Sequence, residues 1–105
     1  MPLSADQVLA RALAAAFAEH GAAVFVEAVD SRPWASVTFS GERHGIGVRL
    51  IGANAERAAD AVLPGLGERE FTLPGHVLID IALERVERDG DDLKLRLGAL
   101  TIEAD

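Results

Sequence analysis

The spacing of the apolar residues changes at Gly21, and this change restricts the possible folds more than any other feature of the chain. Between Ser4 and Gly21 the apolar residues recur every three or four positions, which is the period of a helix with one buried face. Ser4 and Gln7 have the spacing of a capping box, and Gly21 is suited to end the helix. After Gly21 the period becomes two, which is typical of half-buried strands. The predicted buried stripe of the helix consists of Val8, Leu9, Ala12, Leu13, Ala16 and Phe17.

Three short segments with the two-residue period follow the helix, at 22–29, 34–40 and 46–51. Turn-forming residues separate these segments, at 30–33 and 41–44. The second turn sets a register in which Phe39 lies opposite Ile46 on the buried face, with the further pairs Val37–Val48 and Ala35–Leu50. We therefore expect a three-stranded antiparallel meander.

A second helix is predicted from the Asn54 cap to about Leu63, because Pro64 and Gly65 prevent its continuation. Its buried stripe would consist of Ala55, Ala58, Ala59 and Val62. Residues 68–73 then fit a short edge strand, and residues 73–76 fit a type II turn.

The segment 77–83 is apolar at its odd positions, which predicts a strand with these side chains in the core. His76, Asp80 and Glu84 would then face outward, and Glu84 would pair with Arg96 on the following strand. Both assignments depend on regular alternation along the strand.

The last strand would complete a hairpin through a turn at 89–91, with Leu83 opposite Leu97. Beyond Gly98 the apolar positions change parity, to Leu100 and Ile102. A β-bulge at Gly98 or Ala99 would return these two side chains to the core, and we predict one there.

The predicted element order is αβββαββ in a single domain, residues 1–105. It corresponds to an α+β two-layer sandwich, an antiparallel sheet of about five strands with two helices on one face. This order resembles the fold of type III secretion chaperones, and the resemblance implies a small acidic dimer that binds a protein partner. The third helix of those proteins has no counterpart in this sequence.

Charge and composition exclude several classes of function. Ten basic and seventeen acidic residues give a net charge of −7, and no basic stripe is present, so neither nucleic acid nor an anionic membrane is an expected partner. The chain has no cysteine, which excludes disulfides, thiolate chemistry and Cys-ligated metals. The start of the chain lacks the basic residues of a secretory signal, and no apolar run is long enough to span a membrane. We expect a cytoplasmic protein.

No catalytic residue, cofactor site or metal site is predicted. His76, Asp80 and Glu84 share one strand face, but residues four apart on a strand are about 13 Å apart, too far to ligate one ion. No dinucleotide, nucleophile-elbow, zincin or Walker motif occurs.

Two helices can cover only one face of the sheet, so the other face is the predicted interaction surface. It would expose apolar and charged side chains in the mixture typical of protein interfaces, namely Trp34, Arg49, Ile51, Leu78, Asp80, Glu84 and Arg96. We therefore expect a non-enzymatic module that forms a homodimer through this face and has room for a further protein partner. The alternative is a small enzyme or ligand-binding domain with a pocket between the sheet and the first helix, using His76 or Asp80.

Overall fold

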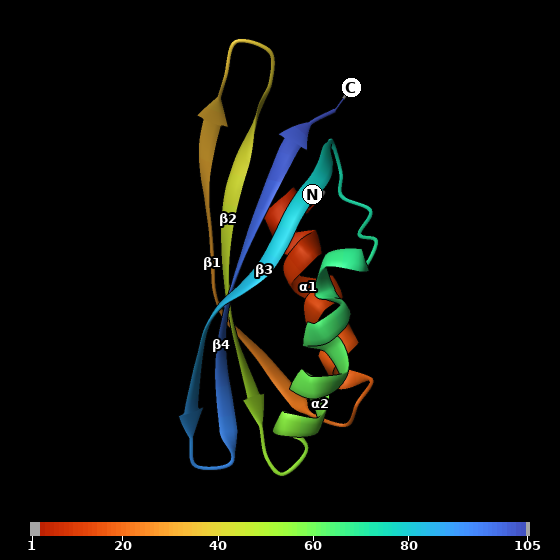
Figure 1. The fold of residues 1–105 in the computed structure, drawn as a ribbon, viewed down its shortest axis with the longest axis vertical. Coiled ribbons are helices and arrows are strands. Elements are labelled where there is room, and N and C mark those ends of the chain that lie inside the picture. Colours follow the sequence, from red (N-terminus) through yellow and green to blue (C-terminus); the bar gives the residue numbers. More distant parts are fainter. Residues whose placement is uncertain (1–2, 105) are drawn as a thin grey trace.

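The computed structural model describes residues 3–104 and shows one antiparallel sheet with both helices packed on the same face (Figure 1). The elements are α1 (Ala5–Ala18), β1 (Ala23–Ala35), β2 (Ser40–Ile51), α2 (Ala55–Val62), the 3-10 helix η1 (Leu63–Glu68), β3 (His76–Asp89) and β4 (Asp92–Glu103). The strand order is β1-β2-β4-β3, so β1 and β3 are the two edges. The predicted α+β class with two helices is confirmed, but the described sheet has four strands instead of about five.

The two N-terminal strands are longer than the sequence predicted, and together they replace the expected meander. β1 continues through the predicted turn at 30–33, and β2 contains the predicted turn at 41–44. The hairpin turns at 36–39 instead, where the Ser36 amide donates to the Phe39 carbonyl at 2.7 Å. Pro33 is tolerated because β1 is an edge strand, where a missing donor interrupts no inner ladder.

The new turn changes the predicted register of this hairpin. Ile46 lies opposite Val29, not Phe39, and the next inward pairs are Val26–Val48 and Val24–Leu50. Val37 and Phe39, both predicted to be buried, are exposed in or beside the loop. The element order is therefore αββαββ, which also removes the basis for the topological resemblance to type III secretion chaperones.

The helices cover the sheet as the apolar spacing predicts. The Ser4 amide donates to the Gln7 side chain at 3.1 Å at the start of α1, and Gly21 follows the helix with φ of 85°. On α2 the predicted stripe is confirmed in full, whereas on α1 the buried residues include Ala5 and Ala10 in place of Val8 and Ala12. The largest fully buried side chains are Phe17, Leu9, Leu13, Ile46, Leu50, Leu97 and Val48, with Val62 and Thr101.

The C-terminal hairpin has its irregularities in β3 and not in β4. Leu83 lies opposite Leu97 as predicted, but the pairing shifts between Leu78 and Asp80 and again between Leu83 and Arg85. β4 pairs with β2 without interruption, so the predicted bulge at 98–99 is wrong. Every second residue of β4 from Leu93 to Thr101 is buried.

The shift at Ile79 inverts the inward parity of β3. Before it the even-numbered Leu78 faces the core, and after it the odd-numbered Ile81 does so. Val77 and Ile79 are consequently 48% and 52% exposed, against the prediction that they are buried. The predicted short strand at 68–73 is also wrong, since within that segment only Leu73 forms an isolated bridge, to His76.

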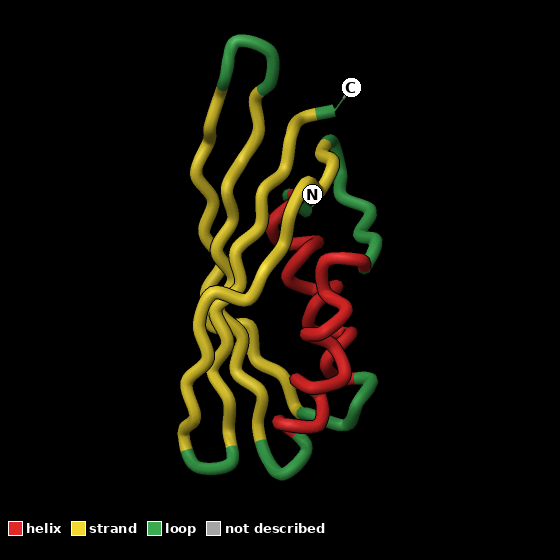
Figure 2. The backbone as a smooth tube through the Cα atoms, viewed as in Figure 1, coloured by secondary structure: helices red, strands yellow, loops and turns green. Residues whose placement is uncertain are grey.

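The molecule is elongated along its strands, with extents of 46 × 26 × 24 Å. The β1–β2 hairpin projects beyond the ends of the other two strands, and its loop stands clear of both helices (Figure 2).

Candidate functional site

The exposed large apolar side chains are confined to the borders of the sheet. Within residues 3–104 they lie on edge strand β1, on edge strand β3, or at the β1–β2 loop, and they comprise Phe25, Val26, Val37, Phe39, Val77, Ile79, Leu83 and Val86. The inner strands β2 and β4 contribute none of them. Edge strands also carry backbone groups that the sheet leaves unpaired, so these borders combine the two features that favour association with another chain.

Trp34, the central residue of the predicted interface, is half-buried on the helix-free face. It lies opposite Gly41 of β2, which in turn lies opposite Ile102 of β4. Because Gly41 has no side chain, the indole can cross β2, and its Nε1 donates to the Thr101 carbonyl at 3.2 Å. A side chain at Gly41 would overlap that same carbonyl. The Trp34 polar group is thus satisfied within its own chain.

The charged candidates on this face are also partly engaged within the chain. Arg49 donates to Asp89 at 2.8 Å and to Asp92 at 2.9 Å, and these two contacts raise its pKa. The pKa of Asp92 is lowered, first by the Gly52 amide that donates to it and then by Arg49. Arg96 pairs with Asp30 of β1 at 2.8 Å, so the predicted Glu84–Arg96 pair is wrong.

The remaining candidates are divided between the two sides of the sheet. Asp80 and Glu84 are exposed on the helix-free side, where the Glu84 carboxylate lies over Gly98, and Ile51 is half-buried on the same side. Leu78 is on the other side, packed against the core, which corrects its predicted outward position. His76 is likewise turned inward, so it does not share a face with Asp80 as predicted.

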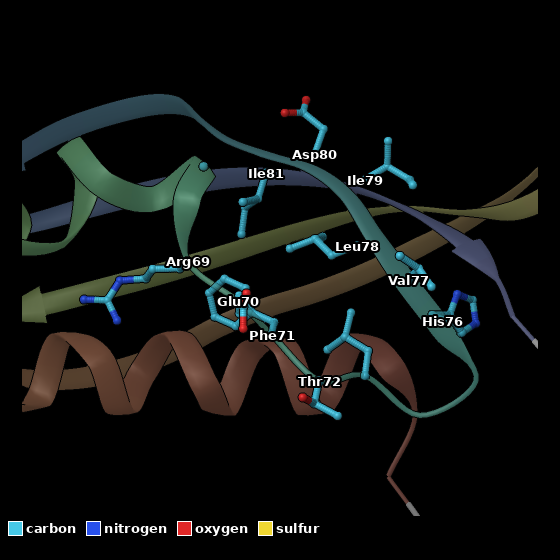
Figure 3. Close-up of a pocket in the computed structure, with 12 residues that line it drawn as sticks. Arg69, Glu70, Phe71, Thr72, His76, Val77, Leu78, Ile79, Asp80 and Ile81 are labelled. Carbon is cyan, nitrogen blue, oxygen red and sulfur yellow. The ribbon is translucent and has the colours of Figure 1, made fainter.

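An open groove of about 400 Å³ separates β3 from the segment that precedes it. Figure 3 shows Leu78 and Ile81 pointing from β3 toward Phe71 of the segment, while Ile79 and Asp80 point away from it. Polar residues lie along its length, namely Arg69, Glu70, Thr72, His76 and Asp80. His76 and Asp80 therefore do line a cavity, but it lies beside η1 and β3 and not between the sheet and the first helix as predicted.

A chain of polar side chains crosses the inner face of the sheet near the start of α1. His44 is 4% exposed and Thr101 is fully buried, so both need partners inside the protein. Thr101 Oγ1 lies 2.9 Å from His44 Nε2 and 2.9 Å from His76 Nδ1. His44 Nδ1 lies 2.7 Å from Ser31 Oγ. Two carboxylates end the chain: Asp6, which accepts from Ser31 at 3.0 Å, and Glu42, whose Oε1 is 3.3 Å from His76 Nε2.

The donor and acceptor roles in this network follow from the number of protons that each group carries. The Asp6 carboxylate can only accept, so Ser31 donates to Asp6, and His44 Nδ1 must donate to Ser31. Nε2 of a neutral His44 then accepts the Thr101 hydroxyl proton, and His76 Nδ1 donates to the Thr101 oxygen. With His76 Nδ1 donating to Thr101, the contact from His76 Nε2 to the Glu42 carboxylate, which can only accept, is a hydrogen bond only when His76 is protonated.

The pKa values of the network agree with this direction. The pKa of His44 is lowered, mainly by burial, although Glu42 and Asp6 oppose that effect. Burial tends to raise the pKa of Asp6, but hydrogen bonds from Ser4 and Ser31 outweigh it and the pKa is lowered. A neutral His44 and a charged Asp6 are the forms that the hydrogen bonds require.

Sequence reasoning missed this network because it placed His44 in a solvent-facing turn. The pattern that would have revealed it is the inward register of Ser31, His44 and Thr101, which requires β1 and β2 to be recognised as one long hairpin. Ser31 contacts the Asp6 carboxylate as well as the His44 imidazole, and its hydroxyl is held between these two groups instead of facing a cavity. The geometry is that of a structural polar network.

Neither a metal-binding cluster nor a membrane-spanning helix occurs in the described part of the chain. Across residues 3–104 no three histidine, aspartate or glutamate side chains converge as a metal-binding group would. No helix in this range combines the length and apolar character needed to cross a membrane.

Comparison with known proteins shows a similarity at the level of the fold. No protein-family model matches the chain, and no curated protein matches it. A chain in the solved structure described as "Virion of native gene transfer agent (GTA) particle" is similar with a TM-score of 0.59 and 19% sequence identity. The alignment covers 88% of this chain and 84% of that chain, so nearly the whole domain shares its fold.

Proposed function

We propose that the chain is a non-enzymatic structural subunit that associates with further copies of itself in a multi-subunit particle. The observation that carries this proposal is the confinement of all exposed large apolar side chains of residues 3–104 to the two sheet edges and the hairpin loop. The similar chain belongs to a virion, which is such a particle, and this supports the proposal.

The charge distribution also favours contacts through the strands. Six basic residues occupy the helix-free face by register, Arg32, Arg43, Arg49, Arg85, Lys94 and Arg96. Six acidic residues balance them, Asp30, Asp80, Glu84, Glu87, Asp89 and Asp92. The chain's net charge of −7 therefore comes from the other residues, so copies repel one another least where this face and its edges meet.

The edges are a better candidate surface than the centre of the face. Trp34, Arg49 and Arg96 already have hydrogen-bond or ion-pair partners within the chain. The large apolar side chains that β1 and β3 expose are instead still in contact with water. Contacts from β1 of one copy to β3 of the next would be heterologous, and such contacts build rings when the rotation closes and filaments when it does not.

Light scattering after size exclusion tests the proposal over a range of protein concentrations. The wild type should run above the monomer mass, and Phe25→Ser combined with Ile79→Ser should weaken association at least tenfold. Trp34→Ala measures the contribution of the helix-free face, and Ala61→Ser, exposed on α2, is the control that should leave the mass unchanged. A wild type that stays monomeric at every concentration would contradict the proposal.

The alternative of a small enzyme is favoured by one observation, the cavity lined by His76 and Asp80. Its geometry does not suit acid–base chemistry, because both ring nitrogens of His76 have partners and Asp80 points away from the groove. Binding of a small ligand there remains testable by thermal shift with a metabolite set. A stabilising compound whose effect is lost in Thr72→Arg, an exposed change at the groove, would support the alternative.

A further inference from the structure

The strand β1 forms one border of the sheet, and its segment 28–35 is the longest regular stretch at either border (Figure 1). The pairing of β1 with β2 shifts only between Val26 and Ala28, whereas the pairing of β3 with β4 shifts at two places. Bulges of this kind protect an edge strand from pairing with another chain. Of the two borders, β1 is therefore better suited to accept a further strand.

The hydrogen bonds of the β1–β2 hairpin show which backbone groups of this edge are free. The Ser36 amide donates to the Phe39 carbonyl at 2.7 Å. Along an antiparallel ladder that starts from this pair, every second residue of β1 directs its amide and carbonyl toward β2. Val29, Ser31 and Pro33 lie between those residues, so their backbone groups point away from the sheet. Proline has no amide hydrogen, so Pro33 offers only its carbonyl.

Charged side chains distinguish the registers in which this edge can pair with a second copy of itself. Asp30 and Arg32 lie on either side of Ser31, and both face the helix-free side of the sheet. Antiparallel pairing centred on Ser31 places Asp30 of each copy opposite Arg32 of the other. A centre at Asp30 or at Arg32 would instead place like charges opposite each other.

The free backbone groups favour the same register. With the centre at Ser31, the Ser31 amide and carbonyl of one copy face those of the other, and the Val29 amide faces the Pro33 carbonyl. A centre at Pro33 would place two residues without an amide hydrogen opposite each other. A centre at Val29 would bring the irregular pairing at 26–28 into the contact.

Arg32 lacks an ion-pair partner in its own chain, and Asp30 has room for a second one. No carboxylate within residues 3–104 forms an ion pair with Arg32, which lies directly opposite Arg43 of β2. Like charges in this position destabilise a hairpin. Asp30 contacts Arg96 through Oδ2, and its side chain is 56% exposed, so Oδ1 can accept from a second guanidinium group. A second copy therefore supplies the partner that Arg32 lacks.

The exposed apolar side chains of this border are placed for the same contact. Phe25 and Val37 are equally far from Ser31 along the chain, one before it and one after it, and both are exposed. Antiparallel pairing about Ser31 therefore brings the apolar loop of one copy to the Phe25 end of β1 in the other.

A hollow between α1 and β1 opens at the same edge. It has a volume of about 190 Å³, is lined on the β1 side by Val26 and Val29, and leaves Val26 39% exposed. Pairing about Ser31 places Pro33 of the second copy opposite Val29, on the side of the sheet that carries the hollow. An apolar ring then lies beside apolar side chains that a single copy leaves open to water.

From these observations we infer that two copies pair edge to edge through antiparallel β1 strands, with their two-fold axis at Ser31, so that one continuous sheet runs through both. This inference rests on the proposed self-association and names the first contact that makes it. Pairing of β1 with β1 is isologous and closes a dimer. The edge strand β3, with its exposed apolar side chains, stays free to join such dimers into a larger particle.

Single-cysteine variants test the register, because the chain has no cysteine of its own. In an equimolar mixture of Asp30→Cys and Arg32→Cys, the two thiols lie opposite each other with Cα atoms about 4.5 Å apart, which suits a disulfide. The other charge pair of this mixed dimer stays complementary, since the first variant keeps Arg32 and the second keeps Asp30. Mild oxidation should therefore link the mixture at least about tenfold faster than either variant alone, measured on non-reducing gels.

A matched pair of charge reversals tests the contact without cross-linking. Arg32 and Arg43 are both exposed on the same face, but only Arg32 belongs to the edge. Arg32→Asp places like charges opposite each other twice in the dimer and should weaken association about tenfold by light scattering. Arg43→Asp should associate like the wild type. Each reversal removes the repulsion between the two arginines, so neither variant should melt below the dilute wild type.

The other outcomes separate this inference from the proposed function. If the wild type associates but the mixture of cysteine variants links no faster than each variant alone, the inference is wrong and the proposed function stands. Equal weakening of association by Arg32→Asp and Arg43→Asp also overturns the inference alone. A wild type that stays monomeric at every concentration overturns both.

Discussion

Replacing Thr101 by valine should destabilise the fold by about 2–4 kcal/mol, although the two side chains have nearly the same shape. The Thr101 hydroxyl is the hydrogen-bond partner of two imidazole nitrogens, His44 Nε2 and His76 Nδ1, each at 2.9 Å. The His44 side chain is buried, so its nitrogen cannot turn to water and its loss approaches the full penalty of about 1–3 kcal/mol. His76 is 12% exposed at its side chain, so we assign its nitrogen a smaller loss, about 1 kcal/mol.

Urea unfolding at neutral pH measures this difference as a shift in the midpoint at constant slope. Thr72→Val, the same substitution at an exposed position, should change the free energy of unfolding by less than about 0.5 kcal/mol. A Thr101→Val protein within about 0.5 kcal/mol of the wild type would refute the assignment of the hydroxyl as the link between the two histidines.

Two further predictions concern the same region. The pKa of His44 lies below its ordinary 6.5, so the unfolded chain takes up this proton first as the pH falls; stability should therefore decrease below about pH 6.5, with a slope approaching about 1.4 kcal/mol per pH unit. Urea unfolding at pH 7.5 and 5.5 measures this dependence of the free energy of unfolding on pH. In His44→Gln the part of the pH dependence that is due to His44 should disappear, and a pH dependence equal to that of the wild type would contradict the prediction. Gly41→Ala should destabilise by at least about 2 kcal/mol, because the added methyl group would overlap the Thr101 carbonyl, where Trp34 also binds. Gly65→Ala, with no atom within 4 Å of the added carbon, is the control that should stay near wild type by thermal unfolding.

The helices could be predicted from sequence because their signals are local. The Ser4–Gln7 pair and the apolar stripe of α2 act within a few residues of the chain, and both are found in the structure. Gly21 ends α1 with a positive φ, which glycine adopts without strain.

The strands could not be predicted as well, because turn residues have different meanings at different places in a sheet. Pro33 indicates a turn in isolation, yet it is compatible with β1 because that strand is an edge. Gly41 likewise resembles a turn residue, but it lies within β2 so that Trp34 can cross the strand. Strand order, which a single sequence does not contain, decides both cases.

The change of parity in the last hairpin was visible in the sequence, but the sequence did not show which of the two strands contains the bulge. A bulge in either strand would resolve it, and the pattern alone favours the strand in which the parity changes. The structure has the shift at Ile79, and the reason is found in the partner strand: β4 pairs on both sides, so an extra residue there would disrupt two ladders. Because the bulge was predicted in β4, His76 and Leu78 were assigned to the outer face of the sheet, and the groove that they line was not predicted.

Hydrogen–deuterium exchange at low and high protein concentration tests the central claim, self-association through the borders of the sheet, most directly. At high concentration the amides of β1, of the 36–39 loop and of β3 should become slower to exchange, while those of α1 and α2 should not change. Equal exchange of the border amides at both concentrations, in a sample whose mass has risen, would contradict the account.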